Sequence, residues 1–439
     1  MPENTDLIKQ AATVLQGNWR SSYTIPAEGL YPHQWLWDSC FIAIGLRHID
    51  VSKAQQELRS LLRGQWSNGM LPHIIFDGSW EYQQDRNIWR SHLSPFAPDN
   101  AYTTGLTQPP MLAEALMQVG AKLHKAERRT WYASMLPALI SHHQWLYAER
   151  DLHGNGLVTQ LHPYETGLDS TPPWIDQLHK HHFPWWAKAL NSTGLLNLVT
   201  LLRRDTQHVP PGQRMDNLDA LLYYDVLRYI RNKHYDAKVI ARHSYFLLQD
   251  LTFNCILIRA NTCLQEMAEF LEKPLPETLS HSMEQTKQNL ELMWDEQSGQ
   301  YYSRNLRTSR LVREPSIATL MPLYAGSISK KRANQLVNLL KDKKLFNTPY
   351  LIPSVPLNSS YFQELRYWQG PTWVNTNWLI VQGLERYGFK DEARHVRQQT
   401  LELVRKNGCY EYFSPLTSEP AGAKNFSWTA ALAIDMAQD

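Results

Sequence analysis

Two acidic residues, Asp169 and Glu411, stand in segments whose composition suits chemistry on a sugar. Asp169 lies in HPYETGLDSTPPW at 162–174, a turn-rich segment with tyrosine and tryptophan nearby. Glu411 alternates with two tyrosines in GCYEYFSP at 408–415. A carboxyl group among aromatic side chains can keep its proton and act as a general acid, whereas an ionised one can act as a general base. Taken singly, each carboxylate is more typical of a solvated loop or a helix cap than of a catalytic group.

The segment YPHQWLWDS at 31–39 could hold the substrate of such a pair. It places Trp35 and Trp37 beside Asp38. A pyranose ring has an apolar face that stacks on indole and a hydroxyl edge that needs polar partners such as a carboxylate. Asp38 could instead cap an apolar helix that begins near Phe41. The segment therefore predicts a sugar contact, a helix start, or both.

A second aromatic segment, RYWQGPTWVNTNWL at 366–379, combines three tryptophans with glutamine and asparagine amides. Its amides could bond sugar hydroxyls while its indoles stack. Its Gly-Pro turn also predicts the start of a helix, where buried tryptophans are common.

Other catalytic chemistries find little support. The chain has no GxSxG, HExxH, Walker or GxGxxG motif, so serine, zinc-protease and nucleotide chemistry are not indicated. The segment HKHH at 179–182 lacks a second ligand cluster at metal-like spacing and is interpreted as a solvated loop. We therefore expect neither a bound metal nor a cofactor.

The amino-acid composition is compatible with a sugar substrate and argues against some other partners. The chain of 439 residues has 16 Trp and 21 Tyr but only 12 Phe, a bias that fits either a tryptophan-rich core or sugar stacking. A net charge of +2 without charged blocks argues against a nucleic-acid partner. No apolar run approaches the roughly 20 residues of a membrane span, and the four scattered cysteines suggest reduced thiols. We expect a cytoplasmic protein with a small carbohydrate substrate; composition gives no indication of oligomeric state.

Helical spacing of apolar residues dominates the chain, with few strand signals. Several of these stretches end in turns with glycine and a short aromatic or apolar run, at irregular spacing. This predicts an all-α toroid of helical hairpins with its loops around one mouth, in preference to a plain bundle, and one domain over residues 1–439. The segment 170–190 is expected to be a loop that forms a wall or lid. The predicted helices cover 7–15, 54–62, 111–123, 131–145, 195–202, 218–230, 251–271, 279–293, 317–340, 378–387, 393–404 and 428–436.

Six segments, taken in order, resemble the signature segments of glycoside hydrolase family 63, most closely its bacterial mannosylglycerate and glucosylglycerate hydrolases. The resemblance spans about residues 14–437 and implies an (α/α)6 barrel that hydrolyses an α-glycosidic bond with inversion. The segments are YPHQWLWD, NGMLPHIIF, TTGLTQPP, ETGLDSTPPW, YWQGPTW, and EYFSPLT followed by FSWTAAL.

The resemblance also implies roles for individual residues. Asp169 matches the general acid and Glu411 the general base that activates water. Inversion would place the two carboxyl groups roughly 6.5–9.5 Å apart. Arg214 falls in the region where the glycerate hydrolases supply a basic residue, and Tyr82 matches their loop tyrosine. The residues expected to bind substrate are Tyr31, Trp35, Trp37, Asp38, Tyr82, Gln108, Arg214, Tyr367, Trp368, Gln369, Trp373 and Trp428.

Two departures from the family pattern bear on the substrate. Asp169 is followed by Ser170 and Thr171 where relatives have Asn and Ser, and Gln369 replaces a usual arginine. Loss of that cation weakens the prediction of a carboxylate-bearing aglycone such as glycerate. The alternatives are a trehalase-like or α-glucooligosaccharide hydrolase, a non-catalytic sugar-binding toroid, and an epimerase that would use His73 and His162 as acid and base.

Overall fold

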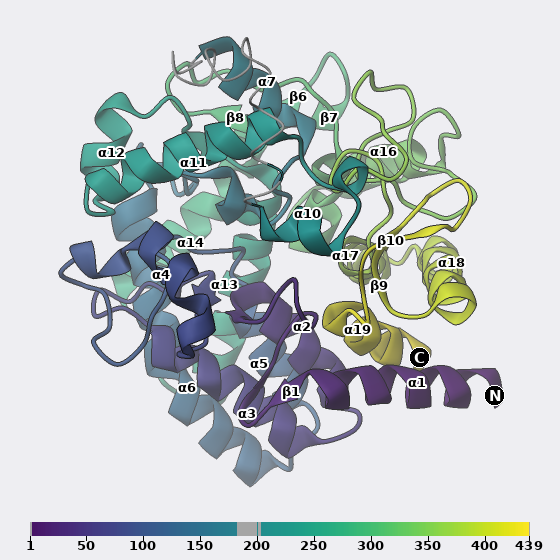
Figure 1. Cartoon of the computed structure of the whole chain (residues 1–439), viewed down its shortest axis with the longest axis horizontal. Helices are drawn as coiled ribbons and strands as arrows, with labels where there is room; N and C mark the ends of the chain where they lie inside the picture. The colour runs from purple at the N-terminus through teal and green to yellow at the C-terminus, as the bar shows by residue number, and fades with distance from the viewer. Residues whose placement is uncertain (1, 182–199, 201–202, 439) are drawn as a thin grey trace.

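A closed ring of inner helices forms the centre of the protein. The computed structural model describes residues 2–181, 200 and 203–438. Among these residues each inner helix packs against the next, and the last closes on the first (Figure 1). This arrangement confirms the predicted all-α (α/α)6 barrel. The inner helices are α2 (Leu36–Leu46), α5 (Leu112–Gly120), α13 (Leu251–Phe270), α15 (Pro322–Ala325), α17 (Val374–Arg386) and α19 (Ser427–Gln438).

An outer layer of helices covers this ring. All eleven residues of the inner helix α2 are buried, whereas the outer α3 buries mainly one face, with Ala54, Leu58 and Leu61 inward. This difference is the one expected between a core helix and an amphipathic surface helix. Figure 1 shows α1 lying along α19 near the C-terminus. The outer helices are α1 (Pro2–Asn18), α3 (Val51–Leu61), α6 (Lys125–Trp145), α14 (Glu277–Asn289), α16 (Lys330–Lys341) and α18 (Lys390–Asn407).

Short antiparallel strand pairs occur between the helices, and several of them precede inner helices. Strand β3 leads directly into α2, β5 into α13, and β10 into α19. The N-terminal ends of α2, α17 and α19 lie together, because the Trp428 ring lies 5.5 Å from that of Trp37 and 5.8 Å from that of Trp373. The pairs are β1 (Trp19–Arg20) with β2 (Tyr23–Thr24), β3 (Gln34–Trp35) with β4 (Ile74–Ile75), β5 (Leu248–Gln249) with β8 (Arg304–Asn305), β6 (Trp294–Asp295) with β7 (Gln300–Tyr301), and β9 (Tyr410–Phe413) with β10 (Pro420–Lys424).

Five further helices lie outside these two sets in the described part of the chain. They are α4 (Gln83–Trp89), α7 (Pro172–His181), α10 (Arg204–His208), α11 (Asn217–Asn232) and α12 (Ala237–His243).

Three expectations about local structure need correction. The helix expected near Phe41 begins at Leu36, which puts Asp38 in its first turn and leaves the cap position to Trp35. The span 317–340 is interrupted, and α16 starts anew where Ser329 accepts a hydrogen bond from the Arg332 N–H.

The segment 170–190 is not a loop throughout. Residues 172–181 form α7, because two prolines occupy its first positions, where a missing N–H costs no hydrogen bond. The remainder, 182–190, lies outside the described residues, as does the predicted helix 195–202 apart from residue 200.

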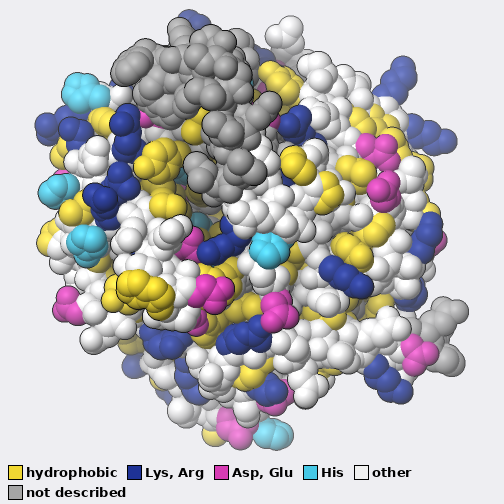
Figure 2. Space-filling view, in the orientation of Figure 1, with side chains coloured by type: hydrophobic (Ala, Val, Ile, Leu, Met, Phe, Trp, Pro, Cys, Tyr) yellow, Lys and Arg dark blue, Asp and Glu magenta, His cyan; other side chains and the backbone are white. Residues whose placement is uncertain are grey.

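Charged side chains of both signs are interspersed over the face seen in Figure 2, without a patch of one sign. In the described part of the chain, no helix is long and apolar enough to cross a membrane.

Candidate active site

A cavity of about 380 Å³ opens among the mouth segments. A larger hollow, of about 680 Å³ between α13 and α14, contains none of the residues expected from the sequence. The smaller cavity brings together five of them, from segments far apart in the chain. These five are Tyr31, Trp35, Asp169, Arg214 and Tyr367.

A rigid loop presents Asp169 to this cavity. Gly167 precedes it with φ +75°, and a β-carbon there would lie 2.7 Å from the Trp37 ring, so the loop needs glycine to pack this closely. The Asp169 carbonyl accepts hydrogen bonds from Trp174 Nε1 at 2.8 Å and from the Tyr223 hydroxyl. The backbone is thereby fixed on one side while the carboxyl group faces the cavity on the other.

The environment of Asp169 favours its protonated form. Burial raises its pKa from 3.8 to about 7, and the charge of Glu411 adds to the increase. A hydrogen bond from Tyr367 Oη to Oδ2, at 3.2 Å, and the charge of Arg214 act in the opposite direction. A carboxyl group that titrates near neutral pH can donate a proton to a leaving oxygen.

The neighbouring Glu165 has a structural role. Arg150 donates to both of its carboxylate oxygens, at 2.8 and 2.7 Å, and the Leu161 N–H donates at 2.7 Å. The carboxylate oxygens of Glu165 accept these hydrogen bonds and so hold the loop in place. Of the two carboxylates in the segment, only Asp169 lines the cavity.

Glu411 is held as a fixed acceptor next to the cavity. It lies on β9 and is 1% exposed. Its carboxylate contacts Tyr31 and Arg214, which line the cavity. Arg214 Nη1 donates to its two oxygens at 3.1 and 3.2 Å, the Tyr31 hydroxyl donates at 2.8 Å, and the Ala423 N–H at 2.9 Å. Position 422 needs a glycine, because a β-carbon there would lie 2.5 Å from Glu411 Oε2. Four hydrogen bonds, two of them from a guanidinium, hold the Glu411 carboxylate in place.

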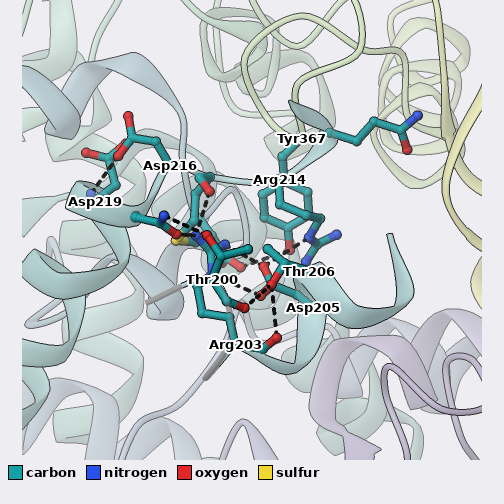
Figure 3. Close-up of polar contacts among 12 residues, drawn as sticks. Thr200, Arg203, Asp205, Thr206, Arg214, Asp216, Asp219 and Tyr367 are labelled. Carbon is teal, nitrogen blue, oxygen red and sulfur yellow. Dashed lines mark hydrogen bonds and ion pairs between the residues drawn. The ribbon is translucent and has the colours of Figure 1, made fainter. Parts of the chain in front are cut away.

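Arg214 and Tyr367 connect the two carboxyl groups. The Arg214 guanidinium lies 4.0 Å from the centre of the Tyr367 ring, and Figure 3 shows the two side chains side by side. Tyr367 donates to Asp169, while Arg214 donates to Glu411 and, through Nε at 3.4 Å, to Asp205. The site thus combines one carboxyl group that keeps its proton with one that is paired to a cation.

Four of the expected tryptophans form a floor of packed rings. Trp368 and Trp373 stack at 3.7 Å with nearly parallel planes, and Trp37 meets Trp428 edge to face at 5.5 Å. All four are at most 4% exposed. These four tryptophans are therefore core residues that pack beneath the site. Of the predicted tryptophans, only Trp35 lines the cavity.

Of the polar residues expected at the site, Asp38 is a buried carboxyl group, and Gln108 and Gln369 are amides that bond to the backbone. Asp38 is buried, and burial together with the charges of Glu411 and Asp169 raises its pKa well above the ordinary range. The amides serve the backbone: Gln108 Oε1 accepts from the Trp37 N–H at 3.3 Å, and Gln369 Nε2 donates to a carbonyl at 3.2 Å.

The histidines considered for an epimerase do not form an acid and base pair. His162 uses both ring nitrogens on backbone groups of Tyr164 and Tyr223, and burial lowers its pKa to about 4. His73 lines the cavity, where Nδ1 bonds the Thr104 hydroxyl at 2.7 Å.

One group of charged residues that lines the cavity was not predicted from the sequence. Arg203, Arg204 and Asp205 line the cavity from the start of α10, together with Asp85 and His33 from two other segments. The only signal in the sequence is the run of adjacent charges, RRD, which is equally typical of a solvated turn. No group of three or more His, Cys, Asp or Glu among the described residues could hold a metal ion.

The raised pKa of Asp169 predicts a cost in stability. Between about pH 4 and pH 7 the folded protein holds a proton on Asp169 that the unfolded chain has released, so stability falls as pH rises through this range. Asp169→Asn cannot ionise. We expect it to be more stable than the parent at pH 8, by roughly 1–3 kcal/mol after allowing for cavity water, and equal near pH 3.5. Denaturant unfolding at both pH values measures this, and equal stability at pH 8 would contradict the assigned environment.

Comparison with known proteins gives consistent results over almost the whole chain. Residues 31–429 match the family model described as the mannosylglycerate hydrolase MGH1-like glycoside hydrolase domain. The mannosylglycerate hydrolase of Thermus thermophilus is 36% identical over 97% of this chain and 99% of its own length. The glucosylglycerate hydrolase of Mycolicibacterium hassiacum is 30% identical over 98% and 97%.

Comparison with solved structures gives the same family. A family 63 mannosylglycerate hydrolase from Thermus thermophilus, in complex with Tris and D-glycerate, superimposes with a TM-score of 0.87 at 35% identity, covering 98% of this chain and 99% of that one. A neutral trehalase from Saccharomyces cerevisiae, with a TM-score of 0.58 at 17% identity, shares the fold alone.

Proposed function

This chain belongs to glycoside hydrolase family 63, and we propose on that basis that it hydrolyses the α-glycosidic bond of a mannosylglycerate or glucosylglycerate with inversion. In this proposal Asp169 protonates the glycosidic oxygen as general acid. Glu411 removes a proton from the attacking water on the opposite side of the sugar ring.

The observation that supports these roles is the contrast between the two carboxyl groups. Burial raises the pKa of Asp169 to about 7, whereas Glu411 receives two hydrogen bonds from Arg214. An acid and a base in one site need environments that push their protonation states apart.

The relatives favour a glycerate aglycone. Relatives at 36% and 30% identity over nearly the whole chain are a mannosylglycerate hydrolase and a glucosylglycerate hydrolase, whereas the similarity to a periplasmic trehalase covers 33% of this chain at 25% identity. The cavity wall contains three arginines, Arg203, Arg204 and Arg214, of which Arg203 is paired with Asp205 and Arg214 with Glu411.

A time course of proton NMR spectra tests the proposal. Mannosylglycerate, glucosylglycerate and trehalose are incubated separately with the protein, and the anomeric signals are followed. We expect free sugar to appear first as the β-anomer from one of the two glycerates, before mutarotation mixes the anomers. Initial release of the α-anomer would contradict inversion, and cleavage of trehalose alone would contradict the substrate.

A further inference from the structure

Side chains from three segments hold the backbone that carries Asp169. The carbonyl group of Asp169 accepts hydrogen bonds from Trp174 Nε1 at 2.8 Å and from the Tyr223 hydroxyl. The next carbonyl group along the chain, that of Ser170, accepts from Gln369 Nε2 at 3.2 Å. Because each peptide unit is a rigid plane, fixing these two carbonyl groups also fixes the direction in which the Asp169 side chain leaves the backbone.

Tyr223 reaches the acid from α11. It is 1% exposed, and its ring meets the rings of His162 and Tyr164 at 5.7 and 5.4 Å, with the planes steeply inclined. His162 Nε2 also lies 3.0 Å from the carbonyl oxygen of Tyr223. The backbone and the ring of Tyr223 are therefore both held, so the position of its hydroxyl is well defined.

Gln369 reaches the same loop from the segment 366–373. Its backbone carbonyl accepts from the Gln363 N–H at 2.7 Å, which closes a tight turn. Two residues earlier, Tyr367 donates to the carboxyl group of Asp169, so this segment contacts the acid at its side chain and the loop at its backbone. Gln369 and Ser170, two positions at which the chain departs from the family pattern, are thus bonded to each other.

Tyr223 and Gln369 are not among the described residues that line the cavity. They can influence the reaction only through Asp169. A general acid must lie within hydrogen-bond reach of the oxygen that it protonates, and a displacement of about 1 Å can cost roughly 10²-fold in rate. Rotation of the peptide planes beside Asp169 would produce a displacement of this kind.

We propose that Tyr223 and Gln369 are positioning residues that aim the Asp169 carboxyl group at the glycosidic oxygen, by holding the carbonyl groups of Asp169 and Ser170. This inference rests on the proposed function, since it requires Asp169 to be the general acid. It also gives Gln369 a task in the acid loop instead of the substrate contact expected from the sequence.

Two substrates with different leaving groups test the inference. Tyr223→Phe and Gln369→Met each remove one donor and keep most of the side-chain volume. We expect each to lower kcat on the α-glycosylglycerate by roughly 10–100-fold, with a much smaller change in KM. On the α-glycosyl fluoride of the same sugar, whose leaving group needs no acid, kcat should stay within about threefold of the parent value. A general loss of structure would lower both activities.

The Asp169→Asn background supplies a second readout. Once the acid is absent there is nothing left to aim, so adding Tyr223→Phe or Gln369→Met should lower the remaining glycerate activity by less than about twofold. A further full loss in this background would mean that the two residues support the fold and do not act through the acid.

Matched controls remove the same kinds of hydrogen bond elsewhere. The Tyr387 hydroxyl donates to the Ile328 carbonyl at 2.8 Å, just beyond the C-terminal end of α17. Gln65 Nε2 donates to the carbonyl groups of Gly69 and Ala138 at 3.0 and 2.9 Å. Tyr387→Phe and Gln65→Met should therefore keep the parent kcat on both substrates.

The outcomes separate this inference from the proposed function. Equal losses on the glycerate and fluoride substrates, or full activity of a variant on both, would overturn the positioning role of the residue concerned. If Asp169→Asn loses glycerate activity selectively while Tyr223→Phe and Gln369→Met do not, only the positioning role fails. If Asp169→Asn keeps its glycerate activity, the proposed function fails and this inference fails with it.

Discussion

Replacing Asp169 with asparagine is expected to lower kcat/KM on the glycosylglycerate substrate by roughly 10²–10⁴-fold. The amide keeps the shape of the side chain and can still accept the 3.2 Å hydrogen bond from Tyr367. It has no proton to give to the departing glycerate oxygen. Steady-state kinetics of the purified variant, with its folding checked by the stability measurement at pH 8, gives the loss directly.

The leaving group decides whether the loss comes from proton donation. Fluoride is a far weaker base than an alkoxide and departs without help from an acid, so Asp169→Asn should hydrolyse the matching α-glycosyl fluoride within about tenfold of the parent enzyme. An equally large loss on the fluoride would mean that Asp169 holds the substrate or the fold instead of supplying a proton.

The same assignment predicts the alkaline side of the pH profile. Because the pKa of Asp169 is raised to about 7, the fraction of protonated acid falls above that pH. In the parent enzyme kcat/KM on the glycerate substrate should then fall about tenfold per pH unit, while the fluoride substrate should show no such fall.

The sequence was sufficient for the ring of helices and for the segments at its mouth. Apolar periodicity marks helices because burial imposes it, and inner helices such as α2 are apolar all round. Interruptions were harder to predict. The span 317–340 keeps its apolar period through the break before α16, since the residues on both sides of the break are buried.

The chemistry of single side chains could be predicted less well. Glu165 and Asp169 share one segment and one composition, and only the position of Arg150 decides which carboxylate is free to react. Arg203, Arg204 and Asp205 line the cavity, but the sequence shows only a run of adjacent charges that is equally typical of a solvated turn. Such distinctions depend on partners distant in sequence.

Glu411→Gln is expected to lower kcat by roughly 10²–10⁴-fold on the glycerate and fluoride substrates alike, because both reactions need an activated water. The amide oxygen can still accept from the Tyr31 hydroxyl, which limits distortion, but it can no longer take a proton. Parallel kinetics on the two substrates measure the effect. Equal losses for Glu411→Gln, beside unequal losses for Asp169→Asn, would distinguish base from acid within one experiment.

The surroundings of Glu411 supply a second, milder test of the same role. Gly422→Ala keeps the carboxylate but introduces a β-carbon 2.5 Å from Oε2, on a residue with φ +71°. The carboxylate must then move away from Arg214 and the Ala423 N–H, so kcat should fall on both substrates although no ionisable group has been removed. A fall confined to the glycerate substrate would contradict a base at Glu411, because an activated water is needed whatever the leaving group.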